Sequence, residues 1–451
     1  MKRILFVLIS LITLVSGGCK NEKVRLLPLH GHLRVTHAAS DAPLITVKVN
    51  DRIKQALSRL DYRDASQLVW FNPGNYSLTL QNTLLDQTTV LLDPIDFAVQ
   101  FDRNYELVIM NNTDDLEYVI LEHEAHNEIP ESMLSFLHAA NASSDLDIYV
   151  TAPDDDIDAA KPLASLSYGD DFDPAALSAG EHRIRITERG ESLVLYDSGT
   201  LDFQKGSHLF FVLANNTEIT DSGAVKSPLT LILNQRKEPT TTLYSVEDGV
   251  DVRIVHDAAD IGAIDVATNE DFSNLLVQDL AFSKFTKYIN ISADTESLQV
   301  AETGMDLPLI NENLKFRDGA TYTLYALGPE EELEILRTRD DPRRVSTEAR
   351  VRLVQGSPVA DRVDIYVAAP SADLTKIKPV LRNIAFKFYT PYISLAEGGY
   401  SVTFTRTNEK QVLFGPIPFA VEKGKVYTAI IRDAPNLSSN YSLILLDDFD
   451  F

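Results

Sequence analysis

Three histidines recur at equivalent places along the chain, each at the end of a short apolar segment typical of a strand. His37, His138 and His256 stand in these places, and Gln355 takes the same place in a fourth segment. A catalytic histidine needs an acid, base or nucleophile within hydrogen-bonding reach. Because glutamine can donate and accept as imidazole can, the exchange favours a side chain that bonds the turn after the strand. We therefore expect a structural role here.

Two short histidine patterns could suggest zinc. The segment HEAH at 123–126 is one residue short of H-E-x-x-H, in which two histidines share a helical face. In a strand, three-residue spacing points the two rings to opposite faces. The segment HGH at 30–32 falls in an N-terminal tether, so neither pattern favours a zinc site.

An acidic run offers the chemistry of a calcium site. Asp154, Asp155, Asp156 and Asp158 lie in one polar insertion, and calcium takes six to eight oxygen ligands, often from loop carboxylates. No D-x-[DN]-x-[DN]-G loop is present, and such a run is usually solvated surface. These four residues are the candidate metal ligands, calcium is the one cofactor suggested, and otherwise we expect none.

The main signals of catalysis are missing from the sequence. It contains no G-x-S-x-G elbow, G-x-x-x-x-G-K-[ST] loop or G-x-G-x-x-G turn. We therefore expect a protein that is not an enzyme. A pair of carboxylates for glycoside hydrolysis stays open, because the acids are too numerous for such a pair to stand out without geometry.

Two neighbouring aromatic residues are candidate ligand contacts. Trp70 and Phe71 lie in LVWFNPG, just before a strand that opens with glycine. Alternating positions of a strand point to opposite faces, so only one of the two can face a core. The other would be exposed beside a loop, where it could contact a glycan or an envelope protein.

The charge balance excludes one class of partner. The chain has 41 Lys and Arg against 66 Asp and Glu, a formal net charge of −25. The negative electrostatic potential of such a chain repels the phosphates of nucleic acid, so we expect no nucleic acid partner.

The N-terminal segment MKRILFVLISLITLVSGGCK indicates an exported, lipid-anchored protein. Basic residues precede an apolar run and small residues, as in a signal peptide. The residues before Cys19, the only cysteine, resemble the lipobox of bacterial lipoproteins, although Ser16 stands where leucine is usual. We expect a signal peptide at 1–18, lipidation of Cys19 and a tether at 19–31. Several acyl chains give stable membrane anchoring. By the same resemblance, Lys20 favours the outer membrane, with the face left open.

The rest of the chain repeats one pattern of strands four times. Segments of four to eight residues alternate apolar and polar side chains, are rich in Val, Ile, Leu, Tyr and Phe, and are separated by turn residues. About seven strands in about 100 residues is typical of an immunoglobulin-like sandwich. The sequence predicts an all-β fold of four tandem immunoglobulin-like antiparallel β-sandwich modules, at 32–128, 133–237, 250–340 and 349–451.

The linkers suggest how the modules are arranged. Only the middle linker, at 237–249, is long enough to predict flexibility, and it divides the chain into two pairs of modules. We expect the modules to extend from the lipid as a short rod.

The repeated opening motif resembles a known family. LRVTHAASDAP from Leu33, VRIVHDAAD from Val252 and VRLVQGSPVADRVDIYV from Val351 are similar to the bacterial cell-envelope domain of unknown function forty-three ninety-seven. The resemblance covers most of the chain after the signal peptide in four divergent copies. It implies an exported β-sandwich module and no established activity.

Together these features favour a non-enzymatic, outer-membrane-anchored lipoprotein that displays its modules for binding or adhesion. Its partners would be the membrane, through the lipid on Cys19, and a glycan or envelope protein. Two alternatives stay open. One is a carbohydrate-active enzyme or accessory protein with a carboxylate site between modules, and the other is a structural spacer with no specialised surface.

Overall fold

The computed structural model describes residues 30–84, 88–125, 131–236, 238–360, 362–433 and 441–448. The expected signal peptide and Cys19 lie outside these residues. Within them, regular structure consists of β-strands and four single 3-10 turns: η1 (Gln55–Leu57), η2 (Thr113–Asp115), η3 (Ile157–Ala159) and η4 (Glu330–Glu332). The strands form eight sheets, paired as four sandwiches, which confirms the all-β prediction of four modules.

Each module has one sheet that contains its opening strand, here called the docking sheet, and a second sheet that closes the sandwich. In module 1 the docking sheet has the order β4 (Val69–Phe71), β1 (Gly31–His37), β7 (Arg103–Met110), β8 (Glu117–Glu124). The second sheet has the order β3 (Arg52–Ile53), β2 (Thr46–Val49), β5 (Gly74–Thr83), β6 (Thr88–Val99).

Module 2 follows the same plan with one added strand. Its docking sheet has the order β12 (Asp171–Leu177), β9 (Ser132–His138), β15 (His208–Asn215), β16 (Leu229–Gln235), β17 (Thr241–Leu243). Its second sheet has the order β11 (Ala164–Leu166), β10 (Leu146–Thr151), β13 (Gly180–Glu188), β14 (Val194–Phe203).

Modules 3 and 4 repeat the four-plus-four arrangement. The docking sheet of module 3 has the order β21 (Ile289–Ile291), β18 (Val250–Asp257), β24 (Thr321–Leu327), β25 (Glu334–Asp340), and its second sheet β20 (Val277–Leu280), β19 (Ile264–Thr268), β22 (Ser297–Glu302), β23 (Ile310–Asn313). Module 4 has β29 (Ile393–Leu395), β26 (Ala349–Gln355), β32 (Val426–Asp433), β33 (Tyr441–Asp448), with β28 (Leu381–Ile384), β27 (Val363–Ala368), β30 (Gly398–Arg406), β31 (Val412–Val421).

The docking sheets are not purely antiparallel. In every module the opening strand runs parallel to a late strand, in the pairs β1–β7, β9–β15, β18–β24 and β26–β32. The reason is that the chain leaves the opening strand for the other sheet, so its neighbours in the docking sheet come from later in the module. The remaining strand pairs described are antiparallel, as expected.

The opening strands are buried on both faces. In β1, Leu33 and Val35 pack into the core of module 1, while Arg34 and Thr36 on the opposite face are only 4% and 0% exposed. A single sandwich with one wet face would leave that second face in water. It is covered here because another module packs on it.

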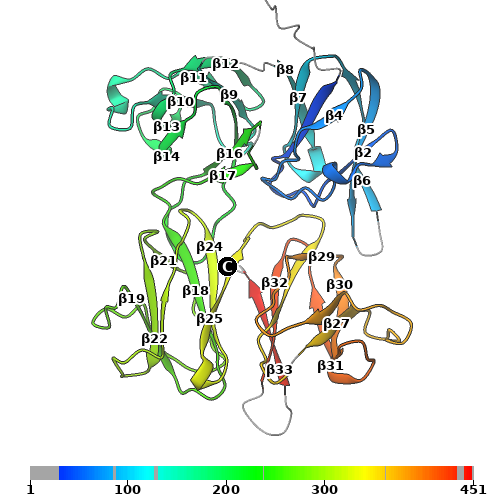
Figure 1. Cartoon of the computed structure of the whole chain (residues 1–451), viewed down its shortest axis with the longest axis vertical. Coiled ribbons are helices and arrows are strands. Elements are labelled where there is room, and N and C mark those ends of the chain that lie inside the picture. Colours follow the sequence, from blue (N-terminus) through cyan, green and yellow to red (C-terminus); the bar gives the residue numbers. More distant parts are fainter. Residues whose placement is uncertain are drawn as a thin grey trace, which may run out of the picture.

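The modules dock in pairs through these sheets. Figure 1 shows modules 1 and 2 side by side above modules 3 and 4. Between the docking sheets of modules 1 and 2 lies an apolar cluster that includes Ala38, Val108, Met110, Leu137, Ala139, Phe210, Val212, Ala214 and Ile232. A matching cluster joins modules 3 and 4: Val255, Tyr325, Leu327, Val354, Ile430 and Leu446.

The expected rod and the flexible middle linker are both wrong. The linker extends the docking sheet of module 2 as β17, and its Tyr244, Ser245 and Asp248 are buried. Asp248 also accepts a hydrogen bond from the Ser227 amide at 2.6 Å. The polar composition of the linker suggested exposure to solvent, but its side chains bond to neighbouring modules and not to water. The predicted division into two pairs is confirmed.

The recurring histidine does bond the turn after the opening strand. In module 3, the Ala258 amide donates to Nδ1 of His256 at 3.4 Å, and Nε2 lies 2.7 Å from the Gly262 carbonyl oxygen. Burial lowers the pKa of His256, which keeps the ring neutral and Nδ1 free to accept. His37 and His138 make the same pair of contacts. The structural prediction is confirmed.

Glutamine should replace this histidine at little cost. In module 4, Oε1 of Gln355 accepts from the Ser357 amide at 3.1 Å, as Nδ1 does elsewhere. We expect His256→Ala to lower the free energy of unfolding by about 1–3 kcal/mol, because buried turn groups lose their partner. His256→Gln should recover most of that loss. Urea unfolding monitored by circular dichroism measures both, and equal losses in the two variants would contradict this role.

Candidate functional site

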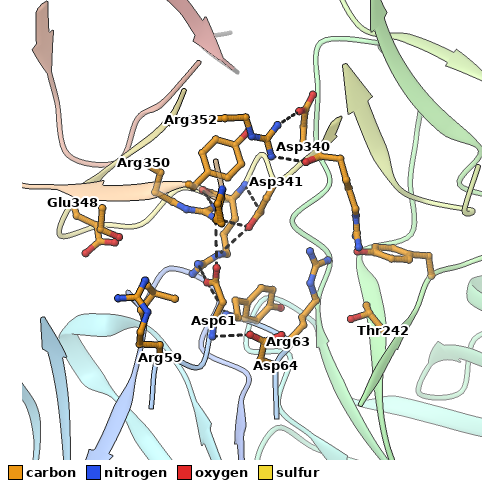
Figure 2. A pocket seen from close by; sticks show the side chains of 18 residues that line it. Arg59, Asp61, Arg63, Asp64, Thr242, Asp340, Asp341, Glu348, Arg350 and Arg352 are labelled. Carbon is orange, nitrogen blue, oxygen red and sulfur yellow. Dashed lines mark hydrogen bonds and ion pairs between the residues drawn. The ribbon is translucent and has the colours of Figure 1, made fainter. Parts of the chain in front are cut away.

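A polar cavity of about 450 Å³ lies where the four modules meet. Its lining comes from the loop before β4, from the segments that join modules 2 to 3 and 3 to 4, from the end of β25, from β26 and from the chain around the start of β29. Figure 2 shows the side chains that line it. Its charged lining residues are Arg59, Arg63, Arg339, Arg343, Arg350 and Arg352, with Asp61, Asp64, Asp340, Asp341 and Glu348. Arginines thus slightly outnumber acids here, in a chain where acids dominate.

Arg343 connects module 1 to the segment between modules 3 and 4. Its guanidinium is almost fully buried and donates to the Asp61 carboxylate and, at 2.6 Å, to the Ala42 carbonyl. Arg350 lies 2.7 Å from Asp341 and 3.6 Å from Asp61. Two guanidiniums and two carboxylates therefore hold the first and last modules together.

Further hydrogen bonds continue this contact. The Ser346 amide donates to the Asp41 carbonyl at 3.0 Å. The Asn82 side chain donates to the buried Glu348 carboxylate, also at 3.0 Å. The contact between modules 1 and 4 thus includes side chains and backbone on both sides.

Glu218 joins three modules at one carboxylate. It is 0% exposed and accepts from Arg63 of module 1 and from the Tyr244 hydroxyl, both at 2.9 Å. Arg339 of module 3 lies 3.3 Å from the same oxygen. The two arginines supply the opposite charge that a carboxylate at this depth requires, because a buried charge without a partner is costly.

Asp340 plays the corresponding part between modules 3 and 4. It accepts from the Thr323 hydroxyl, from the Tyr288 hydroxyl at 2.8 Å and from Arg352 at 2.5 Å. The Arg352 guanidinium also lies 4.1 Å from the ring centroid of Tyr392, a cation–π contact.

The charges of this junction are stable at neutral pH. Burial alone would raise the pKa of Asp341, but Arg350 and Arg343 outweigh it and hold that pKa well below its usual range. The same two arginines lower the pKa of Asp61 against the effect of burial. These carboxylates stay ionised and paired, so they serve to lock the modules and are not available as general acids.

A second and larger cavity, of about 690 Å³, lies between modules 1 and 2. Exposed residues such as Glu124 and Lys205 form its rim, and buried residues from both docking sheets form its floor. The lining mixes apolar and polar side chains. It includes Arg34, Leu68, Asn104, Glu106, Glu122, His123, Met133, Pro174, His208, Phe210, Asn234 and Gln235.

The floor of this cavity holds an incompletely satisfied ion pair. Arg34 and Glu106 lie side by side in the β1–β7 pair, with Nη1 3.8 Å from Oε1, and both are more than nine-tenths buried. Arg34 Nη2 donates to the Gln235 carbonyl at 2.6 Å. Arg34 Nε and Glu106 Oε2 have no hydrogen-bond partner in the part of the chain that the structure describes.

Burial raises the pKa of Glu106 to about 7, against the opposing effect of Arg34. Burial also lowers the pKa of His123, whose ring packs edge-on against His208 at 5.1 Å between centroids. His123 Nε2 is a third buried polar atom without a hydrogen-bond partner among the described residues. The lining of the cavity therefore includes a guanidinium, a carboxyl group and a neutral imidazole.

Trp70 and Phe71 lie on opposite faces of β4, as the alternation predicts. Phe71 is buried in the core of module 1, whereas Trp70 is 57% exposed. Trp70 pairs with His32 of β1, which lies on the same face of that strand as Arg34 of the larger cavity. The exposed aromatic residue and the cavity therefore lie on the same face of the sheet.

The acidic run forms no metal cluster in the structure. Asp155 accepts from the Ala152 amide at 3.1 Å, and Asp156 accepts from the amide of Asp158 to cap η3. Asp154 lies in the turn just before them. Among the described residues, no group of three or more His, Cys, Asp or Glu side chains is placed to hold a metal ion.

The remaining predicted residues lie either in the larger cavity or outside the described residues. Cys19 and His126 lie outside the described residues. His123, the first histidine of HEAH, belongs to the larger cavity, which the sequence reasoning did not anticipate.

A family model described as "Domain of unknown function (DUF4397)" matches residues 31–149 and 250–366, just over half of the chain. The chain belongs to the DUF4397 family. Each matched region covers one whole module and the first two strands of the next, so the DUF4397 pattern begins with modules 1 and 3. Those are the first members of the two docked pairs.

Solved structures similar to this DUF4397 protein are distant. One is a streptococcal virulence factor described as binding alpha-glucan, at 9% identity and a TM-score of 0.18, covering 44% of this chain and 96% of that one. Another is the Bacillus anthracis TIE protein, at 9% identity and a TM-score of 0.14, covering 86% of this chain and 66% of that one. Such scores are too low to support an inference. No curated protein matches.

Among the residues described, no helix is long and apolar enough to cross a membrane.

The sequence reasoning missed the arginine that follows the first residue of the DUF4397 opening motif. Arg34, Arg253 and Arg352 occupy this position in modules 1, 3 and 4, and all three are buried between docked modules. Its recurrence was a usable signal, because a buried strand has no reason to keep a cation without a partner on a neighbouring surface.

Removing Arg343 should open the junction. Arg343→Ala leaves the Asp61 carboxylate and the Ala42 carbonyl without this donor, and hydrogen bonds to charged groups contribute about 1.5–3 kcal/mol each. We expect a lower free energy of unfolding and a larger radius of gyration in small-angle X-ray scattering. The matched control is Arg382→Ala, at an exposed position of β28. An unchanged radius would contradict the locking role.

Acid should weaken the same junction. In the unfolded chain Asp61 and Asp341 titrate near 4, whereas the folded pKa of each is lowered. Their contribution to stability is therefore complete above about pH 4 and is lost as the pH falls through the folded values. The free energy of unfolding should therefore fall as the pH drops below about 4, less steeply in Asp341→Asn. Equal slopes in urea titrations would contradict this.

Proposed function

We propose that this protein is a non-enzymatic binding protein of the bacterial cell envelope, tethered to the outer membrane by a lipid on Cys19. The observation that supports binding is the 690 Å³ cavity between two locked modules, with Trp70 exposed on the same sheet face. Ligand sites are concave and partly apolar, with a few convergent polar groups. A plain spacer has no need of such a cavity.

The polar residues that recur among the modules favour binding over catalysis. His37, His138 and His256 use both ring nitrogens on their own turns. The acids at the four-module junction are paired with arginines. These groups hold the structure together, which leaves the cavity between modules 1 and 2 as the surface for a partner.

The tether can be tested by membrane fractionation of the native cell. We expect the wild-type chain in the outer-membrane fraction and Cys19→Ala in the soluble fraction, because the variant lacks the thiol that carries the lipid. Protease treatment of intact cells then shows on which face of the outer membrane the chain lies, since only a surface-exposed chain is degraded. Cys19→Ala that still sediments with membranes would contradict the tether.

A second candidate function is glycoside hydrolysis at the same cavity. The observation that favours it is Glu106, a buried carboxyl that burial keeps partly protonated near neutral pH, as a general acid must be. Hydrolysis also needs a second carboxylate at a set separation. Glu122 and Glu124 line the cavity, but both are paired with Arg103.

One assay separates these functions. The purified chain is incubated with insoluble envelope polysaccharide, and both the sedimented protein and the released reducing ends are measured. A non-enzymatic binding protein sediments with the polymer and releases no reducing ends. Release that is lost in Glu106→Gln would assign the enzyme, and a chain that neither sediments nor cleaves would leave only the spacer.

A further inference from the structure

The cavity between modules 1 and 2 presents opposite charges close together. The guanidinium of Arg34 and the carboxyl of Glu106 are 3.8 Å apart, and each has one buried polar atom without a hydrogen-bond partner among the described residues. A buried polar atom in a native structure is normally satisfied. A ligand with an acceptor and a donor a few ångströms apart would satisfy both groups.

A charged ligand fits this floor poorly. An anion could bond the remaining N–H groups of Arg34, but it would lie beside the Glu106 carboxyl group, 3.8 Å from that guanidinium. It would also meet the carboxylates of Glu122 and Glu124 at the rim. A cation would face Arg34 directly. A neutral ligand with neighbouring hydroxyl groups satisfies both partners, since each hydroxyl donates and accepts.

The walls and the rim extend the same chemistry. Met133, Phe210 and Leu68 supply apolar surface, while Asn104 and His123 add polar groups. Leu68 lies just before β4, two residues from Trp70, which is about 7 Å along an extended chain. A chain of two or three sugar rings could span that distance and lay one ring on the exposed indole.

We propose that this cavity, with Trp70 at its edge, binds a neutral oligosaccharide of two or three hexose units. Arg34 and Glu106 bond neighbouring hydroxyls of the ring held in the cavity, and Trp70 stacks on a following ring. The inference rests on the proposed binding function and names its ligand class. The cavity volume of about 690 Å³ lies within the range of small-molecule sites.

Calorimetric titration of the full chain tests the assignment. The chain is held in a detergent without a sugar headgroup and titrated with neutral linear trisaccharides of glucose, mannose, galactose and N-acetylglucosamine. We expect at least one to bind with a Kd below about 1 mM. Binding should weaken about tenfold or more in Glu106→Gln and in Trp70→Ala, with partial recovery in Trp70→Phe.

Two controls separate loss of binding from loss of fold. Asp96→Asn makes the same charge change at an exposed position of β6, outside the cavity, and should bind as the wild type does. Trp70→Ala alters an exposed side chain, so its thermal unfolding should match the wild type even if the buried change at Glu106 does not.

The other outcomes are decisive against the inference. Binding of no trisaccharide, binding that both variants retain, or preferential binding of a dipeptide or a sugar acid would each overturn it. If the chain still sediments with envelope polymer while no trisaccharide binds, the ligand class is wrong and the proposed binding function stands. If the chain neither sediments with envelope polymer nor binds a trisaccharide, the ligand class and the proposed binding function are both wrong.

Discussion

A charge buried between two β-sandwiches needs a partner of opposite sign, and this requirement governs how the four modules meet. Arg352 finds Asp340 across the contact of modules 3 and 4, and Arg63 finds Glu218 across the contact of modules 1 and 2. An unpaired ion at such a depth costs several kcal/mol. Apolar contacts alone would tolerate sliding of one sheet over another, whereas these pairs form in one register and so fix the arrangement.

The folds of the single modules could be predicted because their signals are local. Alternation in segments such as LDIYV and VDIYV places every second residue in a core, whatever lies beyond the module. The role of the histidine in the opening motif could be predicted as well, since its replacement by Gln355 in module 4 indicated a hydrogen bond that both side chains can make. Phe71 in the core and Trp70 in solvent follow from the same two-residue period.

The docking of modules and the cavity could not be predicted in that way. A period-two pattern assigns Arg34 to a polar face but does not say whether water or another protein surface covers that face. Glu106 is one acid among many until the parallel pairing of β1 with β7 brings it beside Arg34. The middle linker misled for a similar reason, because its polar side chains, such as that of Asp248, bond to other modules.

Arg343 has a consequence for the order in which the protein is made. The carbonyl of Ala42 and the carboxylate of Asp61 belong to the first module, yet their donor, Arg343, lies after the end of module 3. A chain synthesised from its N-terminus therefore carries module 1 without these two contacts until module 3 has followed. A chain that stops before residue 343 therefore leaves the Asp61 carboxylate without its two arginine partners, Arg343 and Arg350. The contact between the first and last modules forms only after β26 has been made.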